Sequence, residues 1–542
     1  MMQVNANPTT NKTEGADQAM YNILVSDPVS EKGLAPLVGD DNLNVTMENA
    51  ANAGDLSQYD ALIVRSQTTV DAALLEQLTN VKIIARAGVG TDNIDVDKAT
   101  EQGIVVVNAP DGNTISTAEH TFAMLMAASR NIPQANASIK NEEWNRKAFQ
   151  GRELRHKTLG IVGFGRIGAE LSKRAKAFEM DLLVYDPFLT KARAEKLGVE
   201  SVELDEVLKQ ADYITVHTPL TKDTQGLLGM ENIGKTKPGV FLLNCARGGI
   251  VDEEALKHYL DNEHISGAAL DVFEEEPVTN TELACHPNVI ATPHIAASTQ
   301  EAQMNVAVQV AEEVRNFLNG QPALNSINLP AMSKERYAEV QPFYDLTRKM
   351  GNILSQCMKS PAQEIEVNYG GDVADVETSI LTRSLVAGFL GSRIDAPVND
   401  VNASLTAKER GITYGEKQLH NAYGYANIVH AVVHGDHGSF SLQGTYVKEY
   451  GPRIVNINGF NVDFFPTGHL IYIQHSDQPG VIGKMGQLLG EEGVNIATMQ
   501  VGRQTEGGDA IMMLAVDREP TEHVVQVLTS IDEIYKADKI EV

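Results

Sequence analysis

Short apolar runs alternate with longer helical stretches through much of this chain of 542 residues. From residue 21 the runs are YNILVSD, ALIVRS, KIIARAGVG and GIVVVN. A second series reads TLGIVGFGRIG, DLLVYDP, YITVHTP, GVFLLNCARGG, ISGAALDVF and NVIATPH. Strands that alternate with helices are typical of parallel sheets with helical crossovers. The pattern therefore predicts an α/β fold with two doubly wound parallel sheets.

Two long helices are predicted where these units join. Residues 114–130 carry one broad apolar face between the two series of strands. The segment ASTQEAQMNVAVQVAEEVRNFLNG ends in a glycine with a proline two residues beyond, which is a frequent helix end. Its apolar rows indicate a return to the first unit. We therefore expect a first unit made of residues 21–112 and 297–328, interrupted by a second unit of residues 113–296.

The rest of the chain contains a part with few recognisable patterns and a part with clear ones. For residues 329–467 the pattern predicts a further α/β unit and no more. Residues 468–542 contain strand and helix patterns in the order βαββαβ, which is ferredoxin-like. The first of these helices has an apolar row of Val481, Ile482, Met485, Leu488 and Leu489. We expect this row to be buried against the sheet.

The charge of the chain limits the choice of partners. It has 44 basic and 72 acidic residues, which gives a formal net charge of -28. Such a charge repels the phosphates of nucleic acids and anionic membrane surfaces, so we expect neither DNA, RNA nor lipid as a partner. A small anionic substrate remains possible, because a local cluster of arginines and lysines decides that question.

Cysteine content and the N-terminal segment indicate the compartment. Cys245, Cys285 and Cys357 are too few and too scattered for a disulfide framework or a zinc site, which fits a reducing cytoplasm. The first twenty residues, MMQVNANPTTNKTEGADQAM, have neither a basic start nor an apolar run, so we interpret them as a disordered tail rather than a signal peptide. No apolar run reaches the roughly 18 residues that a membrane span requires.

A glycine-rich loop follows the first strand of the second series and opens a helix. In this context GFGRIG is a dinucleotide fingerprint, since its glycines allow a tight turn, close approach of a pyrophosphate and close packing of helix on strand. The next strand ends in an aspartate about 20 residues on, which would bind the ribose and favour NAD over NADP. A plain surface residue before Pro187 is the alternative for this aspartate. The residues assigned to the site are Gly163, Gly165, Arg166, Ile167, Gly168 and Asp186.

Three later segments bring charged groups to strand ends, where ligands bind in doubly wound sheets. CARGG supplies the cation Arg247, DVFEEEP supplies a carboxylate, and TPH supplies the imidazole of His294. Oxidation of a 2-hydroxy acid needs a base, a partner for that base and a cation for the carboxylate. Taken singly, these residues have structural alternatives as a surface cation, a loop charge and a buried histidine. Within the second segment, Glu274, Glu275 and Glu276 all remain open.

Together these motifs resemble the D-isomer-specific 2-hydroxy acid dehydrogenases over residues 21–328, with the spacing of their phosphoglycerate dehydrogenase branch. The resemblance implies Arg247 on the substrate carboxylate, His294 as general acid/base and Glu276, which precedes a proline, as the partner of His294. It also implies a set of residues beside NAD. These are Thr218, Cys245, Ala246 and Asp271.

The same resemblance indicates the substrate. It implies that Arg65 and Ser66 hold the far end of the substrate, and that Gly90 and Asn113 face the same cleft. A guanidinium beside a hydroxyl suits a phosphate dianion. The implied reaction is the NAD-dependent oxidation of 3-phospho-D-glycerate to 3-phosphooxypyruvate, the first step of L-serine biosynthesis. A hydroxypyruvate or glyoxylate reductase is the alternative among enzymes, and an NAD-sensing corepressor is the alternative from another class.

The C-terminal unit resembles an ACT domain, because Asp477-Gln478-Pro479-Gly480 matches its Asp-x-x-Pro-Gly turn. Residues 329–467 match the intervening domain of full-length phosphoglycerate dehydrogenases in size and place. In these enzymes the ACT domain binds L-serine between two subunits, which implies a homodimer or a homotetramer. The implied effector contacts are His475, Asp477 and Asn495. The alternative for Asp477 is that it only caps the following helix.

One basic segment remains open between two interpretations. Trp144-Asn145-Arg146-Lys147 resembles a segment from which a basic residue reaches the active site of the neighbouring subunit. A solvated basic loop is an equally good interpretation of the same residues.

Overall fold

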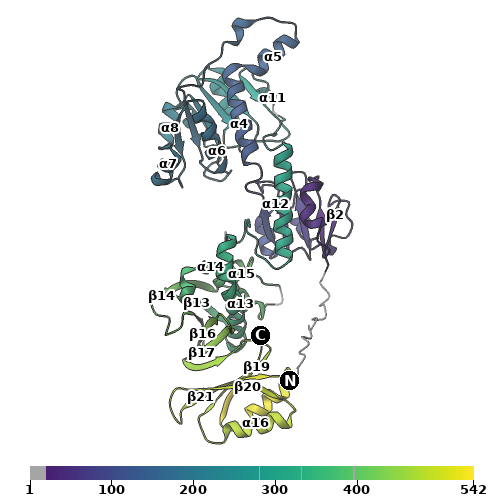
Figure 1. Ribbon diagram of the computed structural model, residues 1–542, viewed down its shortest axis with the longest axis vertical. Helices are drawn as coiled ribbons and strands as arrows, with labels where there is room; N and C mark the ends of the chain where they lie inside the picture. Colours follow the sequence, from purple (N-terminus) through teal and green to yellow (C-terminus); the bar gives the residue numbers. More distant parts are fainter. Residues whose placement is uncertain (1–19, 280, 331, 395–396) are drawn as a thin grey trace, which may run out of the picture.

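The computed structural model describes residues 20–279, 281–330, 332–394 and 397–542. The predicted N-terminal tail lies outside these residues up to position 19. The elongated molecule has four parts, each with its own sheet, and the first part in the sequence lies between the second and the third (Figure 1). No described helix is both long enough and apolar enough to cross a membrane. All three cysteines are free thiols.

The first part is a five-stranded parallel sheet with the order β2-β1-β3-β4-β5. Its strands are β1 (Tyr21–Val25), β2 (Leu43–Met47), β3 (Ala61–Val64), β4 (Ile83–Arg86) and β5 (Val105–Asn108). Its short helices are η1 (Glu31–Leu34), α1 (Ala35–Val38), η2 (Leu56–Gln58), α2 (Ala72–Leu75) and α3 (Val96–Glu101). Four of these strands are predicted by the sequence. The fifth, β2, is not, because it is a partly exposed edge strand with polar residues in alternate positions.

The second part is a seven-stranded parallel sheet with the order β12-β11-β10-β9-β6-β7-β8. Its strands are β6 (Thr158–Val162), β7 (Asp181–Tyr185), β8 (Glu200–Ser201), β9 (Tyr213–Val216), β10 (Val240–Asn244), β11 (Ile265–Leu270) and β12 (Val289–Ala291). Its helices are α5 (Ile132–Lys140), η3 (Arg146–Phe149), α6 (Arg166–Ala177), α7 (Lys191–Leu197), α8 (Leu204–Gln210), α9 (Met230–Gly234), α10 (Glu253–Asp261) and α11 (Thr281–Ala284). All six predicted strands are confirmed, and only the two-residue β8 is added. Strand order reverses between β6 and β9, which is where ligands bind in such sheets.

Two long helices join these parts, as predicted. Helix α4 (Thr114–Arg130) leaves the first sheet and packs on the second through Ala118, Met124 and Leu125. Helix α12 (Gln300–Leu318) returns from the second sheet and packs on the first (Figure 1). Its buried row is Val306, Val310, Ala311, Val314 and Leu318. The first sheet therefore depends on two separate pieces of sequence, and the space between the two sheets is bridged by these helices.

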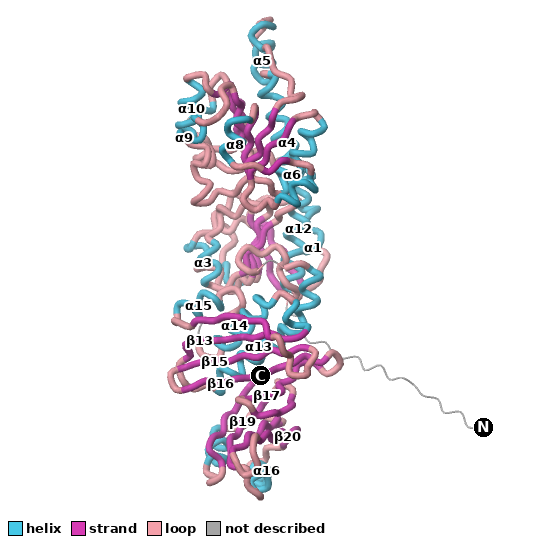
Figure 2. Tube along the Cα trace, turned by 90° about the vertical axis from the view of Figure 1, so that its left-hand side faces the viewer, coloured by secondary structure: helices cyan, strands magenta, loops and turns pink. Residues whose placement is uncertain are grey.

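The third part is a mixed sheet with the order β14-β13-β15-β16-β17-β18, in which only β13 and β14 are parallel (Figure 2). Its strands are β13 (Ala362–Gly371), β14 (Thr413–Leu419), β15 (Asn427–Gly435), β16 (Gly438–Val447), β17 (Gly451–Ile457) and β18 (Phe460–Phe464). Its helices are α13 (Lys334–Cys357), η4 (Asp372–Asp375), α14 (Thr378–Gly391) and α15 (Ala403–Glu409).

The fourth part has the predicted βαββαβ order and an antiparallel sheet, β20-β21-β19-β22. Its elements are β19 (His469–Ser476), α16 (Val481–Glu491), β20 (Ile496–Arg503), β21 (Asp509–Val516), α17 (Glu522–Thr529) and β22 (Ile534–Glu541). One sheet face carries these helices. The other contributes Leu470, Tyr472 and Met513 to the core of the third part.

The predicted apolar row of α16 is only partly correct. Val481, Met485 and Leu489 are buried, but Leu488 is half-buried and Ile482 is 47% exposed. Successive residues of a helix project about 100° apart, so Ile482 cannot share the sheet-facing side with Val481.

Candidate active site

The glycine-rich loop between β6 and α6 is tightly packed at its first and third glycines and open at its second. Gly163 has a φ of +91°, and a Cβ there would lie 2.8 Å from the backbone of His217. A Cβ on Gly168 would lie 2.6 Å from the carbonyl oxygen of Gly163. A Cβ on Gly165 would meet no atom within 4 Å. The first and third glycines are thus required by packing, and the second leaves space for a ligand at the helix N-terminus.

The groups around this space suit a dinucleotide. Gly165 is the N-cap of α6 without a side-chain cap, so the first N–H groups of the helix face the open side and favour an anion. Arg166, the first helical residue, pairs with Asp111 of the first part at 2.6 Å. The hydroxyl of Thr218 is buried and has no hydrogen-bond partner among the described residues. A buried polar atom of this kind needs a partner, which a bound cofactor would supply.

Asp186 lies at the end of β7 in direct contact with the glycine-rich loop. Its Oδ2 accepts a hydrogen bond from the Phe164 N–H at 2.7 Å, and its Oδ1 accepts one from the Phe188 N–H at 2.8 Å. Each carboxylate oxygen retains a second lone pair for a ribose hydroxyl. Asp186 is therefore part of the loop's architecture rather than an isolated surface residue.

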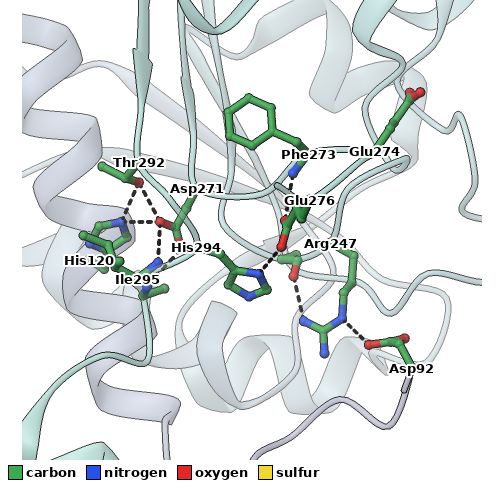
Figure 3. Close-up of polar contacts among 12 residues, drawn as sticks. Asp92, His120, Arg247, Asp271, Phe273, Glu274, Glu276, Thr292, His294 and Ile295 are labelled. Atoms are coloured by element: carbon green, nitrogen blue, oxygen red, sulfur yellow. Dashed lines mark hydrogen bonds and ion pairs between the residues drawn. The ribbon is translucent and has the colours of Figure 1, made fainter. Parts of the chain in front are cut away.

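The imidazole and one carboxylate of the three predicted segments form a pair. His294 Nδ1 lies 2.7 Å from Glu276 Oε2, and Glu276 Oε1 accepts from the Phe273 N–H at 3.0 Å (Figure 3). Glu274 accepts instead from the Glu253 N–H, and Glu275 contacts Thr279. Of the three consecutive glutamates, only Glu276 reaches the imidazole.

This pairing changes the protonation of both residues. The hydrogen bond to Glu276 raises the pKa of His294 above its usual value, although burial and the charge of Arg247 oppose it. Burial by itself would raise the pKa of Glu276, but the hydrogen bonds from His294 and the Phe273 N–H lower it. Because Nδ1 is engaged, Nε2 of His294 is the nitrogen left to exchange a proton with a ligand.

A buried carboxylate supports the turn that carries His294. Asp271 has no exposed surface and accepts hydrogen bonds from the Thr292 hydroxyl at 2.6 Å and from the N–H groups of Ile295 and Ala296, both at 2.9 Å. His120 Nε2 of α4 lies 3.2 Å from the same carboxylate (Figure 3). His294 has a φ of +52°, a conformation that costs L-residues roughly 1–2 kcal/mol. The contacts of Asp271 hold this backbone in place. No sequence pattern indicated His120.

The predicted cation, Arg247, follows the end of β10. Cys245 is buried, and the Ala246 N–H donates to Asn244 Oδ1 at 3.0 Å. The Arg247 guanidinium donates from Nη1 to the Ala246 carbonyl at 2.7 Å and from Nε to Asp92 at 2.9 Å. Arg247 therefore lies between the second sheet and the loop that follows β4.

A further arginine, missed in the sequence, joins Arg247 and Arg65. Arg86 ends β4, and its Nε is buried without a hydrogen-bond partner in the described part of the chain. Burial, followed by the charges of Arg247 and Arg65, lowers the pKa of Arg86 to about 10. A Cβ on Gly88 would lie 1.5 Å from Arg86 Nη1, so the AGVG loop is shaped around this side chain. The sequence feature that could have indicated Arg86 is its position at the end of a strand, immediately before the AGVG loop.

Of the other predicted substrate residues, Gly90 is the one whose contact with this arginine cluster is defined. The Arg65 N–H donates to the buried Asp27 at 2.6 Å, and Ser66 is exposed. A Cβ on Gly90 would lie 1.8 Å from Arg247 Nη2. Asn113, at the start of α4, has a buried Oδ1 without a partner among the residues described. Three guanidinium groups, one of them with a buried and unpartnered Nε, thus mark a site for an anionic ligand.

The predicted effector residues are not together within one chain. Asp477 accepts from Arg503 at 3.0 Å and the Gly507 N–H at 3.2 Å, while Asn495 donates to Asp517 at 2.6 Å. The N-cap of α16 is Gly480 without a side-chain cap, so the alternative that Asp477 caps this helix is wrong. His475, two residues before Asp477, is buried.

The strand register explains the separation. Residues 469 and 496 both pair with Val516, whereas residue 476 pairs with Asp509. At about 3.3 Å per residue, Asn495 and Asp477 lie roughly 30 Å apart along the sheet. One copy of the chain therefore cannot bring both side chains to the same small ligand.

Comparisons with known proteins agree with this geometry. Residues 122–296 match the family model for the NAD binding domain of D-isomer specific 2-hydroxyacid dehydrogenases, which defines an NAD-dependent dehydrogenase. Residues 339–458 match the D-3-phosphoglycerate dehydrogenase intervening domain, and residues 469–533 match the ACT domain. The chain belongs to the D-3-phosphoglycerate dehydrogenase family.

This membership rests on full-length similarity. The chain is 54% identical to D-3-phosphoglycerate dehydrogenase of Bacillus subtilis over 96% of its length and 100% of the relative's. It is 44% identical to the Archaeoglobus fulgidus enzyme over 96% of this chain and 99% of that one. The D-lactate dehydrogenase structure from Aquifex aeolicus, complexed with NAD and lactic acid, covers 57% of this chain and 100% of its own, with a TM-score of 0.52 and 30% identity.

The pairing of His294 with Glu276 predicts a shift in the pH profile of Glu276→Gln. The carboxylate raises the pKa of His294, so its loss lowers that pKa. Alcohol oxidation requires the neutral imidazole, and we therefore expect the acid-side limb of kcat against pH to move to lower pH. Glu274→Gln, which removes a neighbouring charge without touching His294, serves as the control. An unchanged profile for Glu276→Gln contradicts the functional pairing.

Proposed function

We propose that the chain oxidises 3-phospho-D-glycerate to 3-phosphooxypyruvate with NAD, the reaction that begins L-serine biosynthesis. The observation that carries this proposal is the closeness of Arg65 and Arg247 to the buried Arg86, whose Nε has no hydrogen-bond partner in the described part of the chain. Several guanidinium groups suit a substrate that carries both a phosphate and a carboxylate.

The proposed mechanism assigns one task to each side chain. Arg247 binds the substrate carboxylate and thereby orients the neighbouring hydroxyl. His294, neutral at Nε2, removes the hydroxyl proton, and the negative charge of Glu276 stabilises the imidazolium that results. Bound NAD would supply the hydride acceptor for the carbon that carries this hydroxyl. Arg65 and Arg86 hold the phosphate, and Asp271 keeps the His294 turn in its conformation.

The cofactor contacts are assigned from the same geometry. Gly163, Gly165, Arg166, Ile167 and Gly168 form the loop that would hold the pyrophosphate, and Asp186 would bind the ribose. Thr218, whose buried hydroxyl has no partner in the described part of the chain, would border the cofactor, and Cys245 and Ala246 are assigned to the same site from the family resemblance. We assign residues 113–296 to NAD binding, residues 21–112 and 297–328 to the substrate, residues 329–467 to the intervening domain and residues 468–542 to the ACT domain.

The test of this function is a comparison of substrates by the appearance or loss of NADH. We expect 3-phosphoglycerate to be oxidised with a far higher kcat/KM than D-glycerate, and hydroxypyruvate and glyoxylate to be poor substrates in the reverse direction. Preference for unphosphorylated substrates would favour the reductase alternative. A lack of turnover on any 2-hydroxy or 2-keto acid would favour the NAD-sensing corepressor. The cytoplasm, where both substrate and NAD are available, is the proposed location.

We further propose that L-serine binds between two copies of the chain. His475 and Asp477 would come from one ACT domain and Asn495 from the other, since a single chain holds them far apart. The protein would then be a homodimer or a homotetramer. Trp144 is 80% exposed. We therefore keep two proposals for Trp144–Lys147: a contact with the active site of the partner subunit, or a solvated basic loop.

Removal of Asn495 provides the test of the effector site. We expect L-serine to inhibit the wild-type enzyme and to inhibit Asn495→Ala much more weakly, because a lost hydrogen bond to a charged ligand costs about 1.5–3 kcal/mol. The inhibition constant measured with 3-phosphoglycerate and NAD checks this. Asn461→Ala, on strand β18 outside the ACT domain, should retain normal inhibition. Equal inhibition of wild type and Asn495→Ala contradicts the proposed site.

A further inference from the structure

An acidic residue of the first part reaches across the cleft to the substrate-binding arginine. Asp92 lies in the loop after β4, and its Oδ2 accepts a hydrogen bond from Arg247 Nε at 2.9 Å (Figure 3). The Asp92 side chain is 68% exposed, while that of Arg247 is 30% exposed. The carboxylate is therefore held by the guanidinium and remains accessible to water.

The loop is built to bring these two groups together. A Cβ on Gly90 would lie 1.8 Å from Arg247 Nη2 and 2.7 Å from Asp92 Oδ2, so a side chain at this position would displace both groups from where they meet. The amide of Asn93 donates to the carbonyl oxygens of Arg65 at 2.7 Å and Thr68 at 2.6 Å, which fixes the position of the loop. The loop that carries Asp92 is thus fixed to the segment of Arg65, the residue proposed to bind the phosphate.

The donors of the guanidinium decide how a ligand can bind. A carboxylate binds arginine most strongly through two adjacent N–H groups, either Nε with Nη2 or Nη1 with Nη2. Nη1 already donates to the Ala246 carbonyl, and Nε donates to Asp92. Each of the two edges through which Arg247 could bind a carboxylate with two hydrogen bonds therefore has one N–H group already in use. Ala246 is the neighbouring residue in the chain, whereas Asp92 belongs to another part of the fold and is mostly exposed.

We propose that Asp92 is an internal competitor for the substrate carboxylate and thereby a determinant of substrate affinity. It occupies the Nε edge of Arg247 in the free enzyme and is displaced when the substrate carboxylate binds there. The proposal deepens the proposed function, because it depends on Arg247 as the group that holds this carboxylate. Because Asp92 must be displaced, the apparent affinity for a 2-hydroxy acid is lower than it would be if Arg247 had no carboxylate partner.

The expected effect is an improvement on mutation. Asp92→Asn keeps the size of the side chain and removes its charge, so Arg247 should bind the substrate without displacing a carboxylate. Exposed ion pairs contribute little, and we expect kcat/KM for 3-phosphoglycerate to rise roughly two- to fivefold. Asp97→Asn, an exposed aspartate of α3 on the same part of the fold, changes the net charge equally and should leave kcat/KM unaltered.

A second ligand separates competition at Arg247 from a general effect of charge. Glycerol 3-phosphate has the phosphate but no carboxylate, so in Asp92→Asn its inhibition constant should change much less than kcat/KM for 3-phosphoglycerate. An unchanged or lower kcat/KM in Asp92→Asn would overturn the proposal, since Asp92 would then be neutral or would position Arg247. Equal tightening of both ligands would also overturn it.

The failure of this proposal differs from the failure of the underlying site. Arg247→Lys removes the planar fork but retains the charge, and it should greatly lower kcat/KM for 3-phosphoglycerate if Arg247 binds the carboxylate. If Arg247→Lys loses activity and Asp92→Asn gains none, only the role of Asp92 is rejected. If Arg247→Lys is fully active, the assignment of Arg247 itself is wrong.

Discussion

Replacing His294 with asparagine is expected to lower kcat for oxidation of 3-phosphoglycerate by roughly 10² to 10⁴, the usual contribution of a positioned general base. NAD affinity should change little, because the imidazole pairs with Glu276, which is not among the residues assigned to NAD. Asparagine is a better test than alanine, since it tolerates the left-handed conformation at φ +52°. The imidazole is about half exposed, so its removal leaves no buried cavity.

Two measurements check this expectation. The rate of NADH formation at saturating substrates gives kcat, and the quenching of NADH fluorescence on titration gives cofactor affinity. His523→Asn, an exposed histidine of the C-terminal part, serves as the control and should retain wild-type activity. Near-normal turnover of His294→Asn would remove this residue from the mechanism.

The second large effect is expected for Arg65→Ala, and it tests the substrate rather than the reaction class. A bidentate guanidinium–phosphate contact is charge-assisted, and its loss should cost on the order of 1.5–3 kcal/mol. At about 1.4 kcal/mol per factor of ten, kcat/KM for 3-phosphoglycerate should fall roughly 10- to 150-fold. D-Glycerate, which has no phosphate, should lose far less. Arg86 remains in the same cleft, so some phosphate affinity should persist.

The comparison is made by measuring kcat/KM for both substrates with the wild type and with Arg65→Ala. Lys32→Ala removes an exposed cation from the same part of the fold and controls for net charge. Equal losses with 3-phosphoglycerate and D-glycerate would show that Arg65 does not recognise the phosphate. The hydroxypyruvate or glyoxylate reductase alternative would then be favoured.

The strands were predictable to the extent that burial makes their sequences apolar. The central strands of both parallel sheets are buried on both faces, so they appear as continuous apolar runs such as ALIV and YITV. Edge strands are half-exposed and do not have this signal, which is why β2 was missed. The burial of Ile482 was wrongly predicted because a row of apolar letters does not say which side of a helix faces the sheet.

The sequence by itself determined the fold class, the cofactor loop and the three chemical groups of the candidate site, because these depend on local patterns: periodic burial, obligatory glycines and charged residues at strand ends. Only the tertiary structure decided which groups meet. It brought the expected Glu276 into contact with His294, added Arg86 and His120, and separated Asn495 from Asp477. These contacts join residues far apart in the chain, and their distances follow from how the sheets and helices pack rather than from spacing along the sequence.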